Sequence, residues 1–267
     1  MVDEKGYPSL LQAMGLILLY FIFQLIIGIS GGIIGGLTGL WQAELFRYTL
    51  EYYLAPGLGG LLSFLYVKKK YQIAWEEVRG ENIIDLKLYS VIFMTIVGII
   101  LVNSLVINLV ESVFPLQQDF VEHLNRVYAN NLILVFFSLV IIYPVVEEVI
   151  FRGIILRGFL TRYKPWLAIT GSTFLFAVLH LNPWQGAATF VLGLFLGWIY
   201  FKTNSLLLAI IGHSINNLIV VLSTKLSEQP VSTEVELLPI WLIVLGFGLL
   251  LGGIVLINKA KFESKSE

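Results

Sequence analysis

The sequence contains no cysteine, and charged residues make up only 13% of its 267 positions. Without cysteine, the chain can form neither a disulfide nor a thiolate metal site. Soluble domains carry about a quarter charged residues, so the scarcity of charge argues against a water-soluble protein. The formal net charge is −1 and no basic domain stands out, so nothing points to nucleic acid as a partner.

What the sequence has instead is a series of long apolar runs, and hydrophobic residues make up 57% of it. A helix needs roughly 20 mostly apolar residues to cross a bilayer. Eight runs approach that length, so we predict an all-α polytopic membrane protein with about eight spanning helices, forming a single membrane domain over residues 1–267. The expected spans are Leu10–Gly32, Tyr48–Val67, Leu88–Val110, Leu132–Phe151, Trp166–Leu181, Gly186–Phe201, Leu206–Ser223 and Leu237–Ile257.

The distribution of Lys and Arg predicts how these spans are oriented, because basic residues gather on the cytoplasmic side. With the Lys68–Lys70 loop placed there and eight alternating spans, only Arg47, Arg126 and Lys225 fall on the other side. The other fourteen of the seventeen basic residues are then cytoplasmic. Both termini are therefore predicted to lie in the cytoplasm. The expected location is a cell membrane, and the short, loop-poor chain favours a bacterial plasma membrane.

Rows of small residues mark places where membrane helices approach closely. The rows are Gly28, Gly32 and Gly36; Gly31, Gly35 and Gly39; Gly193 and Gly197; and Gly248 and Gly252. We interpret them as packing surfaces and expect no chemistry from them.

Ionisable residues inside the predicted spans are the informative ones, because burying charge in a bilayer is costly. Three spans carry ionisable or amide side chains with a second residue one helical turn away: Glu148 and Arg152, beside Glu147, at the end of the fourth; His180 and Phe176 in the fifth; and His213 and Asn217 in the seventh. Glu148 and Arg152 can pair on one helix face, whereas Glu147 points about 100° away. Each group alone is often structural, as a salt bridge or an interhelical hydrogen bond. Their joint occurrence on three helices favours a shared site.

Two carboxylates, two imidazoles and an amide can together hydrolyse an amide bond. A Glu beside a His can share a water molecule and remove its proton. Exclusion of bulk water makes the carboxylate a better base. A second His and an Asn can donate hydrogen bonds to the oxyanion that forms at an attacked carbonyl. Arg152 would hold Glu148 and limit the net buried charge.

At these residues the sequence resembles the CPBP family of intramembrane endopeptidases, also called the Abi or CAAX-protease-like family. The family pattern is Glu-Glu-x-x-x-Arg, then Phe-x-x-x-His, then His-x-x-x-Asn or Asp, on successive membrane helices. All three motifs occur here in that order, between Tyr143 and Val220. Members include the glutamate-type (type II) CAAX prenyl endopeptidases and bacterial proteins linked to bacteriocin processing and self-immunity.

The resemblance implies an intramembrane endopeptidase whose motif-bearing core lies at about residues 132–223. The implied roles are water activation by Glu147 and His180, an oxyanion site of His213 and Asn217, support by Glu148 and Arg152, and substrate binding by Phe176. Two His and a Glu could instead hold zinc. The zincin His-Glu-x-x-His motif is absent, however, so we favour a metal-independent mechanism and leave the cofactor open.

Two other functions remain as alternatives. Because the family includes immunity-associated proteins, the chain could be a non-catalytic bacteriocin-immunity or peptide-binding protein. Buried Glu and His can also relay protons in a transporter, but the sequence has no clear inverted repeat. For the endopeptidase, the expected partners are the lipid bilayer and a membrane-associated peptide or protein substrate. The sequence indicates neither whether that substrate is prenylated nor the oligomeric state.

Two local questions are also left open by the sequence. Asn216 is a rival to its neighbour Asn217 for the functional face of the seventh span. The segment Glu111–Asn131 alternates polar and apolar residues, which fits either an interfacial amphipathic helix on the outer side or a solvated loop.

Overall fold

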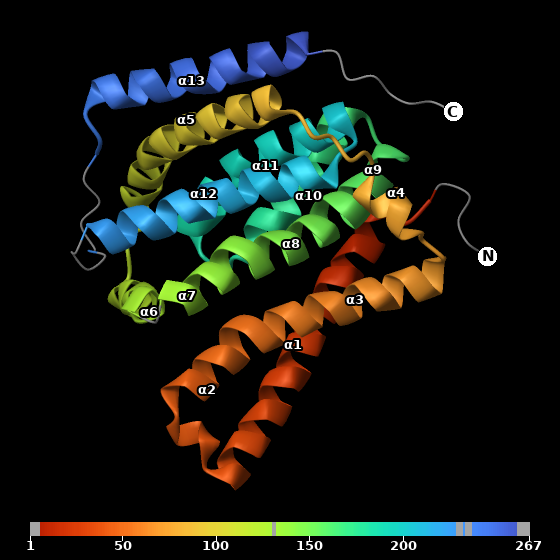
Figure 1. Cartoon of the computed structure of the whole chain (residues 1–267), viewed down its shortest axis with the longest axis vertical. Coiled ribbons are helices and arrows are strands. Elements are labelled where there is room, and N and C mark those ends of the chain that lie inside the picture. The colour runs from red at the N-terminus through yellow and green to blue at the C-terminus, as the bar shows by residue number, and fades with distance from the viewer. Residues whose placement is uncertain (1–5, 130–131, 228–231, 233–236, 261–267) are drawn as a thin grey trace. The chain divides into compact units, whose positions relative to one another are not determined.

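The computed structural model describes residues 6–129, 132–227, 232 and 237–260, and every regular element in these ranges is a helix (Figure 1). Within them, six helices are long and apolar enough to cross a membrane. These are Leu10–Thr38, Leu86–Glu111, Leu132–Leu160, Pro183–Thr203, Leu206–Leu226 and Ile240–Lys259. The prediction of an all-α polytopic membrane protein is therefore confirmed.

The other two predicted spans also fold as helices, but they are not among these six. The second lies in a continuous helix over residues 44–71, formed by α2 (Glu44–Thr49), the π-helical η2 (Leu50–Leu54) and α3 (Ala55–Tyr71). The fifth is α10 (Pro165–Leu179), which is apolar but has only 15 residues. At that length it spans about 22 Å, which is less than a bilayer core of roughly 30 Å.

The count of eight spans and the cytoplasmic placement of both termini thus stay predictions. Three of the lysines that support this orientation, Lys5, Lys261 and Lys265, lie outside the described residues.

The chain forms two compact units, and the division between them falls inside α10. The first unit is Met1–Gly80 with Asn130–Ser172, and the second is Glu81–Ala129 with Thr173–Glu267. The first motif belongs to the first unit, and the second and third motifs belong to the second. The single membrane domain expected from the sequence stays a prediction.

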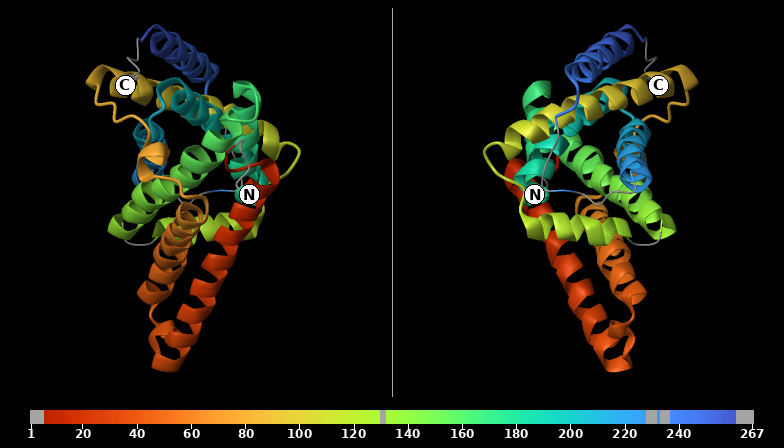
Figure 2. Two further views of the ribbon diagram at one scale, coloured as in Figure 1. Left: turned by 90° about the vertical axis from the view of Figure 1, so that its right-hand side faces the viewer. Right: turned by 90° about the vertical axis from the view of Figure 1, so that its left-hand side faces the viewer.

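In the first unit, α1 (Leu10–Thr38) and the helix of residues 44–71 form an antiparallel pair, drawn in red and orange in Figure 2. A Cβ atom at Gly31 would meet the Leu50 side chain, and one at Gly35 would meet Phe46. Gly31 and Gly35 therefore lie in a helix interface, as their row predicts. The neighbouring row is only partly used, because nothing lies within 4 Å of a Cβ at Gly28 or Gly36.

The first motif lies in a continuous helix over residues 132–160 that contains two π-helical segments. Its parts are α7 (Leu132–Val135), η3 (Phe136–Ile142), α8 (Tyr143–Glu148), η4 (Val149–Leu156) and α9 (Arg157–Leu160). Pro144 has no N–H to donate to the preceding turn, and the wider turns of η3 come directly before it. All eight residues of η4 are buried, so other parts of the protein surround the turns that carry Arg152.

The segment before α1 packs against the end of the motif helix. Gly158 of α9 has no side chain, and a Cβ there would collide with Pro8 and Tyr7. Arg162 Nε donates a hydrogen bond to the carbonyl oxygen of Gly6 at 3.1 Å, and the Tyr7 ring stacks on Tyr71 with centroids 3.7 Å apart. These contacts tie the beginning of the chain to both α9 and the end of α3.

The core of the second unit forms where α5 (Leu86–Glu111), α11 (Pro183–Thr203) and α12 (Leu206–Leu226) pack together. Its buried residues include Ile92, Ile96, Leu196 and Ile199, and α13 (Ile240–Lys259) adds Ile257. Figure 1 shows α13 running alongside α5.

The segment between α5 and α7 contains an amphipathic helix, α6 (Gln118–Ala129), which answers one question left open by the sequence. One face is buried through Val121 and Val127, and the Phe120 ring stacks on Trp184 with centroids 5.2 Å apart. Asn130 and Asn131, at the end of the segment, lie outside the described residues. The placement of α6 at a membrane interface stays a prediction.

The helices α5 and α13 approach closely at two glycines. A Cβ at Gly98 would lie 2.7 Å from the backbone oxygen of Gly246, and nothing lies within 4 Å of a Cβ at Gly248 or Gly252. The predicted packing role of the Gly248 row is therefore wrong. Position 248 is rotated by about 200° from position 246, so its row faces away from α5.

We expect Gly98→Ala to destabilise the protein by about 1–3 kcal/mol, because the added methyl group meets backbone that cannot move without separating two helices. Gly248→Ala is the matched control, since it makes the same change of helix propensity at an open position. Thermal unfolding in detergent compares the two variants. Equal stability of the two would contradict this close approach.

Candidate functional site

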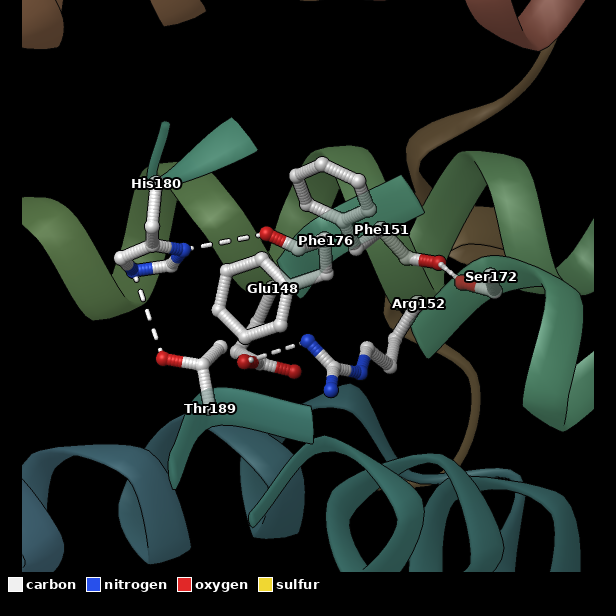
Figure 3. Close-up of polar contacts among 7 residues, drawn as sticks. All are labelled: Glu148, Phe151, Arg152, Ser172, Phe176, His180 and Thr189. Carbon is white, nitrogen blue, oxygen red and sulfur yellow. Dashed lines mark hydrogen bonds and ion pairs between the residues drawn. The ribbon is translucent and has the colours of Figure 1, made fainter. Parts of the chain in front are cut away.

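A buried ion pair connects two residues of the first motif. Arg152 donates a hydrogen bond from Nη1 to Oε1 of Glu148 at 2.9 Å, and the two side chains are 1% and 0% exposed (Figure 3). The pairing follows the four-residue spacing seen in the sequence. Arg152 also interacts electrostatically with Glu147. One guanidinium thus partly balances two buried carboxylates, as a low-dielectric environment requires.

Glu147 is buried on α8, with 7% of its surface exposed. Tyr143, one turn earlier on the same helix, and Tyr20 from α1 both interact with it electrostatically. Sequence reasoning missed both tyrosines. The four-residue spacing could have indicated Tyr143. Tyr20 carries no comparable signal, because its neighbours depend on how α1 packs in the first unit.

Gly59 and Gly60 of α3 show why α1 and α8 can both pack against that helix. A Cβ at Gly59 would lie 2.9 Å from the Gln24 side chain of α1, and one at Gly60 would collide with Val146, the residue before Glu147. Two adjacent glycines therefore allow helices from different parts of the sequence to approach α3 closely.

In the first half of α10, Ser172 makes a hydrogen bond to the helix of residues 132–160. Its hydroxyl donates a hydrogen bond to the backbone oxygen of Phe151 at 2.9 Å, and Ser172 is 2% exposed (Figure 3). Phe151 lies in η4, beside Arg152. This bond satisfies a buried carbonyl in a π-helical segment, where the regular hydrogen bonding of an α-helix is interrupted.

In the second unit, Phe176 lies between the two histidines of the second and third motifs. Its ring is fully buried and meets His180 and His213 edge to face, with centroids 5.3 and 5.8 Å apart. The structure thus brings Phe176, His180 and His213 together. This explains why an aromatic residue occupies that position, since one ring supports both imidazoles. The role of Phe176 in substrate binding stays a prediction.

His180 follows the last turn of α10 and has a polar contact at each ring nitrogen. Its Nδ1 lies 3.0 Å from the backbone oxygen of Phe176, and its Nε2 lies 3.5 Å from Oγ1 of Thr189 on α11 (Figure 3). Thr189 was not identified from the sequence. A threonine in an apolar helix is common, and only the turn between α10 and α11 brings it to His180.

The third motif lies on α12, where His213 is buried and Asn217 follows one turn later. Asn216 donates a hydrogen bond from Nδ2 to Oδ1 of Asn217 at 3.0 Å. The two neighbouring amides are therefore hydrogen-bonded to each other. Which of them belongs to the functional face of α12 stays open. The assignment of His213 and Asn217 to an oxyanion site stays a prediction.

Among the residues that the structure describes, no group of three or more His, Asp or Glu side chains is placed to hold a metal ion. The structure brings Glu148 to Arg152 in one unit and Phe176 to both histidines in the other. A shared site would need residues of both units, so it stays a prediction.

The helical architecture and the ionisable side chains buried within it define a multi-pass membrane protein with polar groups inside its apolar helices. Residues 129–219 match the family model described as Type II CAAX prenyl endopeptidase Rce1-like. This segment contains all three motifs, so the resemblance recognised from the motifs is confirmed. The match supports a membrane protease. Searches of curated proteins and of solved structures found no match.

Proposed function

We propose that this protein is an intramembrane endopeptidase that hydrolyses a peptide bond in a membrane-associated peptide or protein. The observation that carries this proposal is the burial of Glu147, Glu148 and Arg152 in one apolar helix, within a segment that matches a protease family. Ionisable groups in membrane helices are costly to bury and mark functional sites.

In the proposed mechanism, Glu147 and His180 hold the attacking water molecule. Glu147 takes a proton from it, and the resulting hydroxide-like oxygen forms a bond to the scissile carbonyl carbon. His213 and Asn217 donate hydrogen bonds to the oxyanion of the tetrahedral intermediate. When the intermediate collapses, the C–N bond breaks and the proton held by Glu147 passes to the leaving amine.

The remaining motif residues support this chemistry in the proposal. Glu148 and Arg152 form a buried ion pair, so they limit the net charge near Glu147. Phe176 supports both imidazoles with one ring. These buried contacts limit the movement of the proposed catalytic side chains, which must keep their geometry to within about 0.5 Å.

We further propose that the protein acts in a bacterial plasma membrane on a peptide such as a pheromone, a bacteriocin precursor or a leader peptide. The coarser role, a protease in a membrane, does not depend on this choice of substrate.

The experiment is cleavage of a membrane-peptide library by the purified protein and its His180→Ala variant, each with and without a zinc chelator. His123→Ala is the matched control, because His123 is exposed on α6 and lies outside the motifs. We expect the wild type and His123→Ala to cleave the same peptides and His180→Ala to cleave none. Sensitivity to the chelator would reveal a metal.

Normal cleavage by His180→Ala would contradict the proposal. If the wild type cleaves nothing, the non-catalytic immunity or peptide-binding alternative becomes the better explanation of the buried motifs.

A further inference from the structure

The contact between His180 and its own helix determines which of its ring nitrogens carries a proton. Nδ1 lies 3.0 Å from the backbone oxygen of Phe176. A carbonyl oxygen can only accept, so Nδ1 must be the donor in this hydrogen bond. In a neutral imidazole the other nitrogen then has the lone pair. Nε2 of His180 is therefore the nitrogen that can accept a proton.

The side chain that faces this lone pair is Thr189, which is 9% exposed on α11. Its Oγ1 lies 3.5 Å from Nε2 of His180. Unlike Nδ1, Nε2 has no hydrogen in this tautomer, so the Thr189 hydroxyl must be the donor. In the described part of the chain this hydroxyl makes no other hydrogen bond, so its proton is available for the contact.

The turn between α10 and α11 is built so that Thr189 reaches His180. Asn182 donates from Nδ2 to the backbone oxygen of His180 at 3.0 Å, and its Oδ1 accepts from the backbone N–H of Gln185 as the cap of α11. Farther along, Gly186 allows close packing, since a Cβ there would lie 3.2 Å from the backbone oxygen of Ala177. The turn and the helix pairing hold Thr189 in place through backbone contacts.

We propose that Thr189 is a positioning residue for His180: its hydroxyl holds the imidazole with Nε2 as the proton-accepting nitrogen. The catalytic meaning of this inference rests on the proposed function, whereas the hydrogen bond itself does not. At 3.5 Å this hydrogen bond is longer than most in proteins. A long bond orients the ring and still leaves the lone pair accessible to a water molecule.

The hydrogen bond can be tested by nitrogen NMR of the full-length protein in detergent, labelled with ¹⁵N-histidine. His180→Gln identifies the signals of this ring among the three histidines. Above the titration range of histidine, we expect a protonated Nδ1 and a lone pair on Nε2. Thr189→Val should move the Nε2 signal toward that of an unbonded nitrogen, and Thr189→Ser should keep it close to the wild-type value.

The positioning role is tested with the same variants and a cleaved peptide. Loss of one hydrogen bond should lower kcat about tenfold, with KM unchanged because peptide binding is not involved. Thr189→Ser should restore kcat. The matched control is Thr173→Val, which removes another buried hydroxyl of the second unit.

Several results would overturn the proposal: a proton on Nε2 in the wild type, an unchanged Nε2 signal in Thr189→Val, or an unchanged kcat in that variant. The NMR measurement also separates this proposal from the proposed function. If the wild type cleaves no peptide but shows the expected signals, the hydrogen bond stands and its catalytic meaning fails together with the proposed function.

Discussion

Replacement of Glu147 by Gln is expected to lower the rate of peptide cleavage by about 10²–10⁴-fold, which is the usual contribution of a general base. Gln keeps the shape of the side chain but cannot take a proton from water. Glu147 is buried with Tyr20 and Tyr143 as electrostatic neighbours, so a neutral amide should be accepted there without loss of folding. The measurement is single-turnover cleavage of a peptide identified in the library.

Glu76→Gln is the control for the Glu147 variant, since Glu76 is an exposed carboxylate on α4 (Trp75–Arg79) outside the predicted spans. It should cleave at the wild-type rate. Both variants should keep the unfolding temperature of the wild type within a few degrees. A Glu147→Gln protein that remains fully active would show that another group acts as the base. In an immunity assay, protection that survives Glu147→Gln would favour the non-catalytic alternative.

The second large effect is expected at the ion pair, where Arg152→Met should destabilise the protein by about 3–5 kcal/mol. The substitution leaves the Glu148 carboxylate buried without the guanidinium that balances it, in a segment where all residues are buried. Replacing both partners, in Glu148→Leu with Arg152→Met, should recover most of this stability, because two apolar side chains leave no buried charge. Reversible unfolding in detergent measures the free energy of unfolding of the wild type and of both variants.

A second ion pair in the same unit provides the control. Arg157 and Glu77 also form a salt bridge, but their side chains are 28% and 47% exposed. Water already solvates these charges, so Arg157→Met should change stability by no more than about 1 kcal/mol. If Arg157→Met and Arg152→Met lose equal stability, burial does not make the Glu148–Arg152 pair more costly to break than the exposed pair.

Some features of the candidate site follow directly from sequence spacing. Glu148 and Arg152 are four residues apart, and in a helix this separation places them on one face, where the structure shows them paired. The same spacing explains why Phe176 contacts His180. Such predictions succeed because they depend only on the helix to which both residues belong.

Contacts between helices were much harder to predict. The spacing of Gly248 and Gly252 fits a packing row, yet Gly246 makes the contact with α5. Thr189 lies in an apolar helix, where a threonine hydroxyl is often bonded within its own helix and gives no sign of another partner. Tyr20 also lies in an apolar helix, and nothing in the sequence indicates which helix its ring will meet. Which residues meet across a helix interface depends on the rotation of each helix about its own axis.

By itself, the amino-acid sequence determined that this is an all-α membrane protein, and it contains the three motifs of residues 129–219, the segment that matches a protease family model. Both conclusions rest on local properties, namely hydrophobic runs long enough to span a bilayer and residues separated by one helical turn. Only the tertiary structure decided which side chains surround Glu147 and His180. Tyr20 comes from a helix distant in sequence, and Thr189 from the helix after α10, so close backbone approach at glycines and the turn after α10 decide these contacts.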